Sequence, residues 1–328
     1  MGKSLPWTAG NGSARGRHRP DQHGQTLATR KEAIPARPEP VHSRAHREPY
    51  ASHSPQGNGH KDPKRKQAQP VTAPRRASTI EVKVRYVPDR MFTDPRLAEM
   101  YDLLDSDRSD LNAYAAMAEE FGARSLLDVG CGTGTLACML AQRGLQVTAI
   151  DPADASLKVA QGKSGAHRVK WLRTDAANLP PMQVDLAVMT GNVAQVFPTD
   201  EEWSVALRSA HAALRPGGRL AFESRDPNRK AWLAWTRDQT CRRVDIPGIG
   251  AVRTWIDLTG ASSKLVSFRT TFVFERHGGI LTSDSTLRFR SRSELVDTLA
   301  AANLTVEDVR GAPDRPGREM VFIARRTV

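Results

Sequence analysis

The sequence is poor in cysteine and in aromatic residues and has no long apolar run, and two of these shortages exclude whole classes of protein. The three cysteines, Cys131, Cys138 and Cys241, are too few and too scattered for a disulfide scaffold or a zinc site. No run approaches the ~20 apolar residues of a membrane span, and the N-terminus lacks the apolar stretch of a secretory signal. We therefore expect a cytoplasmic protein in a reducing compartment, with no bound metal ion and no membrane partner.

Basic residues are plentiful, but they are concentrated at one end of the chain. Residues 1–90 contain 18 Lys and Arg against 7 Asp and Glu, whereas residues 91–328 contain 30 against 29. Residues 1–78 also hold 10 of the 21 prolines and few large apolar side chains, so they cannot bury enough surface to offset the entropy lost on ordering. We predict a disordered basic tail over residues 1–90, interrupted at most by a short strand at 80–86, and one folded domain over residues 91–328.

The tail has three interpretations that the sequence leaves open. It is a flexible arm for anionic partners, a targeting segment, or a stretch absent from the working protein. The third is favoured, because Met91 stands where the folded pattern begins and because Arg outnumbers Lys 37 to 11, as in GC-rich coding sequence.

The remaining sequence alternates between short apolar runs and segments with helical spacing, which predicts βαβ units and a parallel sheet. After the fifth strand this rhythm gives way to runs rich in Val, Thr and Phe, which predict an antiparallel meander inserted over about residues 228–290. The expected strands are 125–129, 146–150, 169–173, 184–189, 219–223, 251–258, 265–275, 281–290, 304–309 and 320–325, and the expected helices are 96–104, 111–121, 135–143, 154–161, 199–214, 229–236 and 291–302.

The decisive stretch is residues 126–135, in which an apolar strand runs into a turn with glycine at alternate positions and then into a helix. Glycine allows positive φ angles and close approach of a ligand to the backbone, and a helix start offers free N–H groups. Acidic residues stand at three consecutive strand ends, namely Asp128, Asp151 and Asp175. They suit a ligand with a ribose, an amino group and an ammonium, and they would repel a pyrophosphate.

These motifs, together with Asp151-Pro152, 174–176 and 214–218, resemble the class I S-adenosylmethionine-dependent methyltransferases over roughly residues 91–328. The resemblance implies a Rossmann-like α/β fold, with a seven-stranded, mostly parallel sheet whose last two strands form an antiparallel hairpin, and S-adenosylmethionine as cofactor. In that family the acids contact the methionine amine, the ribose and the adenine in turn. The implied cofactor-binding residues are Asp128, Gly130, Cys131, Gly132, Gly134, Asp151, Pro152, Asp175, Ala176, Thr190, Gly191 and Asn192.

Several of these residues also have an ordinary structural interpretation. Asp128 and Asp175 are of the type that caps turns, the latter with Asn178, and Cys131 is more simply a small space-filling residue than a nucleophile. The sequence does not identify a general base. The weak catalytic candidates are Tyr101, Asn192 and Glu223, with Asp102, Arg225 and Asp226 also near the expected cleft.

The resulting hypothesis is a methyltransferase that acts on an O or N atom of a small-molecule acceptor, because similar enzymes build lids for such acceptors from insertions after the fifth strand. A nucleic-acid methyltransferase that uses the basic tail is one alternative, although the Asn/Asp-Pro-Pro-aromatic motif of amino-methylating members is replaced by residues 190–193, TGNV. An NAD(P)-dependent oxidoreductase is another, although the spacing is G-x-G-x-G rather than G-x-G-x-x-G. A binding module without activity is the third. The acceptor and the oligomeric state stay open.

Overall fold

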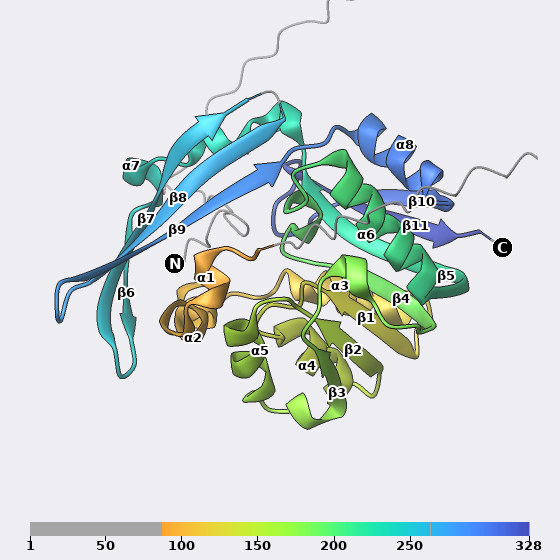
Figure 1. Ribbon diagram of the computed structural model, residues 1–328, viewed down its shortest axis with the longest axis horizontal. Coiled ribbons are helices and arrows are strands. Elements are labelled where there is room, and N and C mark those ends of the chain that lie inside the picture. The colour runs from red at the N-terminus through yellow and green to blue at the C-terminus, as the bar shows by residue number, and fades with distance from the viewer. Residues whose placement is uncertain (1–86, 263, 328) are drawn as a thin grey trace, which may run out of the picture. The chain divides into compact units, whose positions relative to one another are not determined.

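The computed structural model describes residues 87–262 and 264–327 (Figure 1). The expected disordered tail, with the strand expected at 80–86, lies outside the described residues except for residues 87–90. No helix in the described ranges is both long and apolar enough to cross a membrane.

A seven-stranded sheet forms the centre of the described part and has the strand order β10-β11-β5-β4-β1-β2-β3. Strands β1 to β5 run parallel to their neighbours, whereas β11 runs antiparallel to β5 and pairs with β10 as an antiparallel hairpin. The expected Rossmann-like fold class is therefore confirmed. The strands are β1 Ser125–Val129, β2 Gln146–Ile150, β3 Val169–Leu172, β4 Val184–Met189, β5 Leu214–Arg225, β10 Leu304–Gly311 and β11 Glu319–Arg326.

Helices cover both faces of this sheet because successive strand residues point to opposite faces. Leu126 packs with helices α3 and α4, and its neighbour Leu127 packs with α6 and α8. Both α6 and α8 begin with the capping boxes expected from the sequence, Thr199 with Glu202 and Ser291 with Glu294. The helices are α3 Leu111–Glu120, α4 Thr135–Gln142, α5 Asp154–Gln161, α6 Asp200–Ala213 and α8 Arg292–Ala301.

A separate antiparallel sheet of four strands, β6-β7-β8-β9, stands between β5 and α8 in the chain, where the insertion was expected. The sequence pattern indicated only three of its strands. It missed β6 because three of the five residues of that strand are charged, which obscures the apolar alternation. The strands are β6 Arg242–Ile246, β7 Gly250–Ala261, β8 Leu265–Phe274 and β9 Gly279–Arg288.

Two local predictions around this insertion were wrong. The helix expected over 229–236 is replaced by 3-10 turns, because Lys230 adopts a left-handed conformation with φ of 44° that a helix cannot continue through. Strand β5 also begins earlier than expected, since Gly218 lets it approach the backbone of β4 closely. The short elements are η1 Ala166–Arg168, η2 Ala176–Asn178, η3 Val193–Gln195, η4 Pro227–Arg229, η5 Ala231–Ala234 and α7 Arg237–Thr240.

Two N-terminal helices, α1 Arg90–Thr93 and α2 Pro95–Leu104, lie between the two sheets (Figure 1). Met91 and Leu97 belong to the same apolar core as Phe268 and Phe272 of β8. The backbone N–H of Met91 also donates a hydrogen bond to Ser283 Oγ of β9, at 2.9 Å. The four-stranded sheet is therefore held to the rest of the domain by its packing on these helices as well as by its covalent connections to β5 and α8.

We predict that Phe322→Ala will lower the free energy of unfolding by about 3–5 kcal/mol. Phe322 is fully buried in β11, and its ring stacks on that of Phe222 in β5 with centroids 5.3 Å apart. Urea unfolding of the full chain, followed by tryptophan fluorescence, measures the change. The control is Leu233→Ala, at a side chain that is 65% exposed, which should shift stability by less than about 0.5 kcal/mol. Equal losses for both variants would contradict the prediction.

Candidate active site

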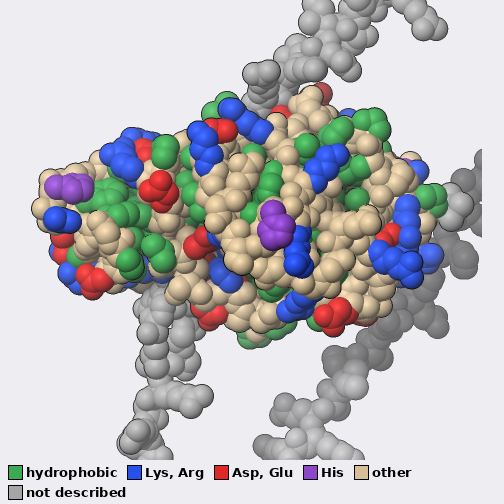
Figure 2. Space-filling view, turned by 90° about the horizontal axis from the view of Figure 1, so that it is seen from below, with side chains coloured by type: hydrophobic (Ala, Val, Ile, Leu, Met, Phe, Trp, Pro, Cys, Tyr) green, Lys and Arg blue, Asp and Glu red, His purple; other side chains and the backbone are tan. Residues whose placement is uncertain are grey.

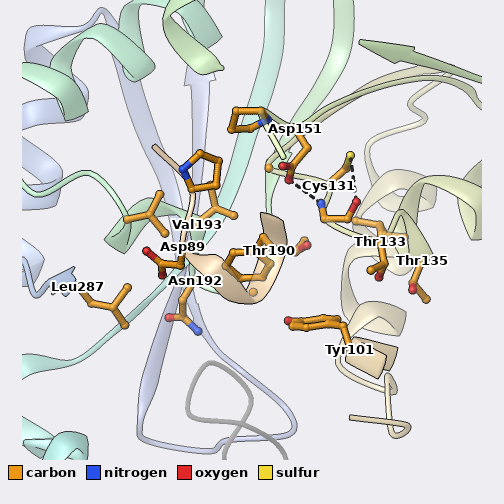
Figure 3. Close-up of a pocket in the computed structure, with 18 of the residues that line it drawn as sticks. Asp89, Tyr101, Cys131, Thr133, Thr135, Asp151, Thr190, Asn192, Val193 and Leu287 are labelled. Carbon is orange, nitrogen blue, oxygen red and sulfur yellow. Dashed lines mark hydrogen bonds between the residues drawn. The ribbon is translucent and has the colours of Figure 1, made fainter. Parts of the chain in front are cut away.

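A pocket opens at the carboxyl ends of β1, β2 and β4, where the strand order reverses and where open parallel sheets bind their ligands. Its empty space is about 960 Å³ when the open mouth to solvent is included. Its walls come from the glycine loop, the ends of β2 and β4, helices α1 and α2, and strand β9 (Figure 3). Nine predicted site residues line it, namely Tyr101, Gly130, Cys131, Gly132, Asp151, Pro152, Thr190, Gly191 and Asn192.

The three glycines of the loop all have positive φ angles, but they serve different purposes. A Cβ on Gly130 would lie 2.7 Å from a methyl carbon of Val193, and a Cβ on Gly134 would lie 2.5 Å from the Trp171 ring. A Cβ on Gly132 would meet no atom within 4 Å. The outer two glycines are therefore required by packing within the protein, whereas Gly132 leaves open space in the pocket for a ligand.

Asp151, which follows β2, holds this loop in place. Its Oδ2 accepts the backbone N–H of Gly132 at 2.8 Å, and its Oδ1 accepts that of Ala153 at 2.8 Å (Figure 3). Burial raises the pKa of Asp151, and the two backbone hydrogen bonds oppose that rise. Each oxygen keeps a further lone pair, so the carboxylate can accept a pair of ligand hydroxyls while it anchors the loop.

Asp128 lies in β1 immediately before the loop and is 1% exposed. Neither of its carboxylate oxygens has a hydrogen-bond partner within the described ranges. Burial, followed by the nearby charge of Asp151, raises the pKa of Asp128 to about 7. A buried carboxylate without donors is costly, so this position fits a ligand that brings a cationic group.

Asp175 and Ala176 follow β3 but do not line this pocket. Asp175 Oδ1 accepts the backbone N–H of Ala177 at 3.1 Å and the side-chain amide of Asn178 at 2.7 Å. The residue thus makes the turn cap that was the alternative interpretation. Its role toward an adenine stays a prediction.

The loop after β4 is held from behind by Glu223 of β5. Glu223 Oε1 accepts the N–H of Asn192 at 3.0 Å, and Oε2 accepts the hydroxyl of Tyr114 at 2.9 Å. Burial and the nearby Glu319 raise the pKa of Glu223. Glu223 does not line the pocket. Its contacts instead position the loop that includes Asn192, and Asn192 itself lines the pocket wall.

The remaining base candidates are held in contacts of their own. Asp102 accepts the hydroxyl of Thr133 at 2.7 Å and pairs with Lys163 at 2.5 Å, which ties α2 to the glycine loop. Arg225 lines the pocket but donates to Gln195 Oε1 at 3.0 Å, and Asp226 accepts the N–H of Asn228 at the start of η4. Tyr101 faces the pocket, and burial raises the pKa of its phenol above the ordinary value.

The partly buried thiol of Cys131 has little nucleophilic character. Burial, with the nearby Asp128 and Asp151, raises the pKa of that thiol well above its usual value. This favours the interpretation of Cys131 as a filler residue. In the part of the chain that the structure describes, no group of three or more His, Cys, Asp and Glu side chains could hold a metal ion.

Sequence reasoning missed several residues of the pocket wall. Asp89, Phe92 and Arg108 come from the N-terminal segment, and Leu287 comes from β9. Asp89 was assigned to the tail because the boundary was set at Met91. No local signal marks Leu287, because its approach to the pocket depends on how the inserted sheet packs.

Residues 126–218 match the family model described as "Methyltransferase domain". This segment is a methyltransferase domain. The match covers the glycine loop and the ends of β2, β3 and β4. The pocket described above is lined by residues of this matched segment together with residues of the N-terminal segment, β5 and β9.

The known proteins that this chain resembles in sequence match part of the chain rather than its whole length. A cypemycin N-terminal methyltransferase of Streptomyces sp is 30% identical over 138 residues, which are 41% of this chain and 56% of that protein. A ubiquinone biosynthesis O-methyltransferase of Idiomarina loihiensis is 32% identical over 116 residues, 34% and 46% of the two chains. The chain thus spans about half the length of these relatives. A solved S-adenosylmethionine-dependent methyltransferase of Clostridium acetobutylicum shares the fold, with a TM-score of 0.60 and 15% identity over 71% of this chain and 98% of its own.

We predict that Asp128→Asn will raise the melting temperature of the ligand-free protein at pH 8 and change it less at pH 5. The pKa of this carboxyl is raised in the folded state, so the folded protein binds the extra proton between about pH 4 and 7 and loses stability as the pH rises through that range. Asparagine removes this dependence. Thermal melts at both pH values measure the effect, and a variant less stable than the wild-type protein at pH 8 would contradict it.

Proposed function

We propose that this protein transfers the methyl group of S-adenosylmethionine to an O or N atom of a small-molecule acceptor. The observation that carries the proposal is the buried carboxylate of Asp128, which has no hydrogen-bond partner in the described ranges and lies just before a loop that opens toward the pocket at Gly132. A ligand with an ammonium group would satisfy that carboxylate. Asp128 is not itself among the lining residues, but it stands just before the loop whose Gly130 and Gly132 line the pocket.

The other residues of the site have complementary roles in this proposal. Asp151 accepts the ribose hydroxyls with the lone pairs that its backbone contacts leave, and Asp175 with Ala176 contacts the adenine. Thr190, Gly191 and Asn192 form the wall beside the reacting methyl group. The cofactor supplies a methyl group already activated on a sulfonium, so the protein has mainly to hold the acceptor in line with it.

The acceptor would lie on the far side of the pocket, where the second sheet closes it. Leu287 of β9 and Phe92 of α1 line this side with Val196, and the sheet shares its core with α1 and α2. Such a cover excludes water from the reaction. A pocket walled on this side by the second sheet favours a small acceptor over a polymer.

The alternatives have less support from the described residues. On the face seen in Figure 2, Lys and Arg side chains stand beside acidic ones rather than in a continuous basic area, whereas nucleic-acid binding needs a basic footprint. An oxidoreductase is disfavoured because the acids Asp128 and Asp151 stand next to the glycine loop, where a dinucleotide would place its pyrophosphate and where they would repel it.

For the cell, we propose a reducing cytoplasmic setting, because Cys131, Cys138 and Cys241 are all free.

Calorimetric titration of the full chain with S-adenosylmethionine and separately with NAD⁺ tests this function. We expect binding of the former only, and Asp151→Ala should weaken it by about tenfold or more, since hydrogen bonds to a charged group are lost. The matched control is Asp154→Ala, three residues later in α5, where the carboxylate pairs with Lys158 on the surface. It should bind within about twofold of wild type.

A labelled methyl-donor assay against a metabolite extract then tests transfer itself. Tight binding of NAD⁺ without S-adenosylmethionine would overturn the proposal. So would cofactor binding with no labelled product from any extract, which would favour the binding module.

A further inference from the structure

Asp89 is placed unusually for a residue at the start of a helix. It occupies the N-cap position of α1, yet its side chain makes no capping hydrogen bond to that helix. The carboxylate instead accepts the hydroxyl of Ser285 in β9 at 2.5 Å and lines the pocket. Figure 3 shows it beside Val193 and Leu287, across the cavity from Cys131 and Thr133 of the glycine loop.

The backbone around Asp89 is held on two sides. Met91 donates its N–H to Ser283 of β9, and the carbonyl oxygen of Phe92 accepts the hydroxyl of Ser156 in α5 at 3.0 Å. Ser283, Ser285 and Leu287 alternate along β9 and therefore share its inward face. The carboxylate is thus preorganised between the two sheets rather than free to leave the pocket.

The surroundings make this carboxylate distinctive in the pocket. Asp89 and Asp151 are the only acids among its described lining residues, and Asp151 stands at the glycine loop. The two lining cations are already engaged, Arg108 with Asp110 and Arg225 with Gln195. Burial raises the pKa of Asp89, Asp284 of β9 adds to the rise, and the hydrogen bond from Ser285 lowers it.

We propose that the acceptor is a small amine with an apolar body, and that Asp89 is the catalytic residue that binds its nitrogen and takes its proton. This inference rests on the proposed methyl transfer. The apolar body would pack on Phe92, Val196 and Leu287. A carboxylate attracts an amine in its cationic form, whereas an alcohol brings no charge to it.

The chemistry balances as a proton transfer followed by a single displacement. The bound ammonium gives one proton to the Asp89 carboxylate, which leaves a lone pair on nitrogen. That lone pair forms the new bond to the methyl carbon, while the carbon–sulfur bond breaks and its electron pair stays on sulfur. The methylated nitrogen carries one positive charge, and Asp89 returns its proton to water. A carboxylate with a raised pKa suits this step, whereas an alcohol holds its proton too tightly for the same base before transfer.

The test uses the full chain loaded with S-adenosylhomocysteine, so that binding is measured without turnover. Matched probes are cyclohexylamine with cyclohexanol and benzylamine with benzyl alcohol, titrated by ligand-observed NMR. We expect at least one amine to bind about tenfold or more tightly than its alcohol. Asp89→Asn should reduce that preference to within about threefold while S-adenosylhomocysteine affinity stays within about threefold of wild type.

Asp284→Asn is the control, because Asp284 precedes Ser285 but its 63% exposed side chain pairs with Arg269 at 2.7 Å. It should keep the amine preference. The inference is overturned if Asp89→Asn keeps the preference, if amines and alcohols bind alike, or if neither amine binds the loaded wild-type protein. Failure of S-adenosylhomocysteine to bind the wild-type protein is a different result, which overturns the proposed function and this inference with it.

Discussion

The hydrogen bond between the Asp151 carboxylate and the Gly132 N–H is the contact from which the rest of the site is built. It joins the loop after β1 to the end of β2, so the sheet itself sets the position of the loop. Thr133, next in the loop, then donates to Asp102 of α2, and α2 shares an apolar core with the second sheet. A single carboxylate at a strand end is thus connected, through a series of contacts, to the second sheet, which walls one side of the pocket.

The same arrangement carries an electrostatic cost. Asp128 and Asp151 are both buried at one sheet edge. Burial raises the pKa of each carboxyl, and the charge of Asp151 adds to the rise at Asp128. A site built only for stability would place a neutral or paired group there. Binding of a cation relieves the cost, so part of the binding energy comes from a penalty already present in the ligand-free fold.

Much of the sheet was predictable because its information is local. Short apolar runs located the strands, and Thr199 with Glu202 indicated the start of α6. Features that depend on distant contacts were not predictable. Gly134 is required by the ring of Trp171, which comes from β3, and Lys230 takes a left-handed conformation that its sequence neighbours do not signal. The glycine motif thus lies at the pocket, whereas the reason for each glycine became visible only in the fold.

Asp89 shows why the boundary of a domain is harder to predict than its centre. Its partner Ser285 lies 196 residues later, and the composition on its N-terminal side is that of the tail, so a count of charges and prolines assigns it to the wrong part. Met91 was a plausible start on the same grounds, yet a chain beginning there would lack the carboxylate that faces the pocket. The packed segment therefore extends upstream of the apolar pattern, because Asp89 is held by one long-range hydrogen bond to Ser285 rather than by burial of a hydrophobic face.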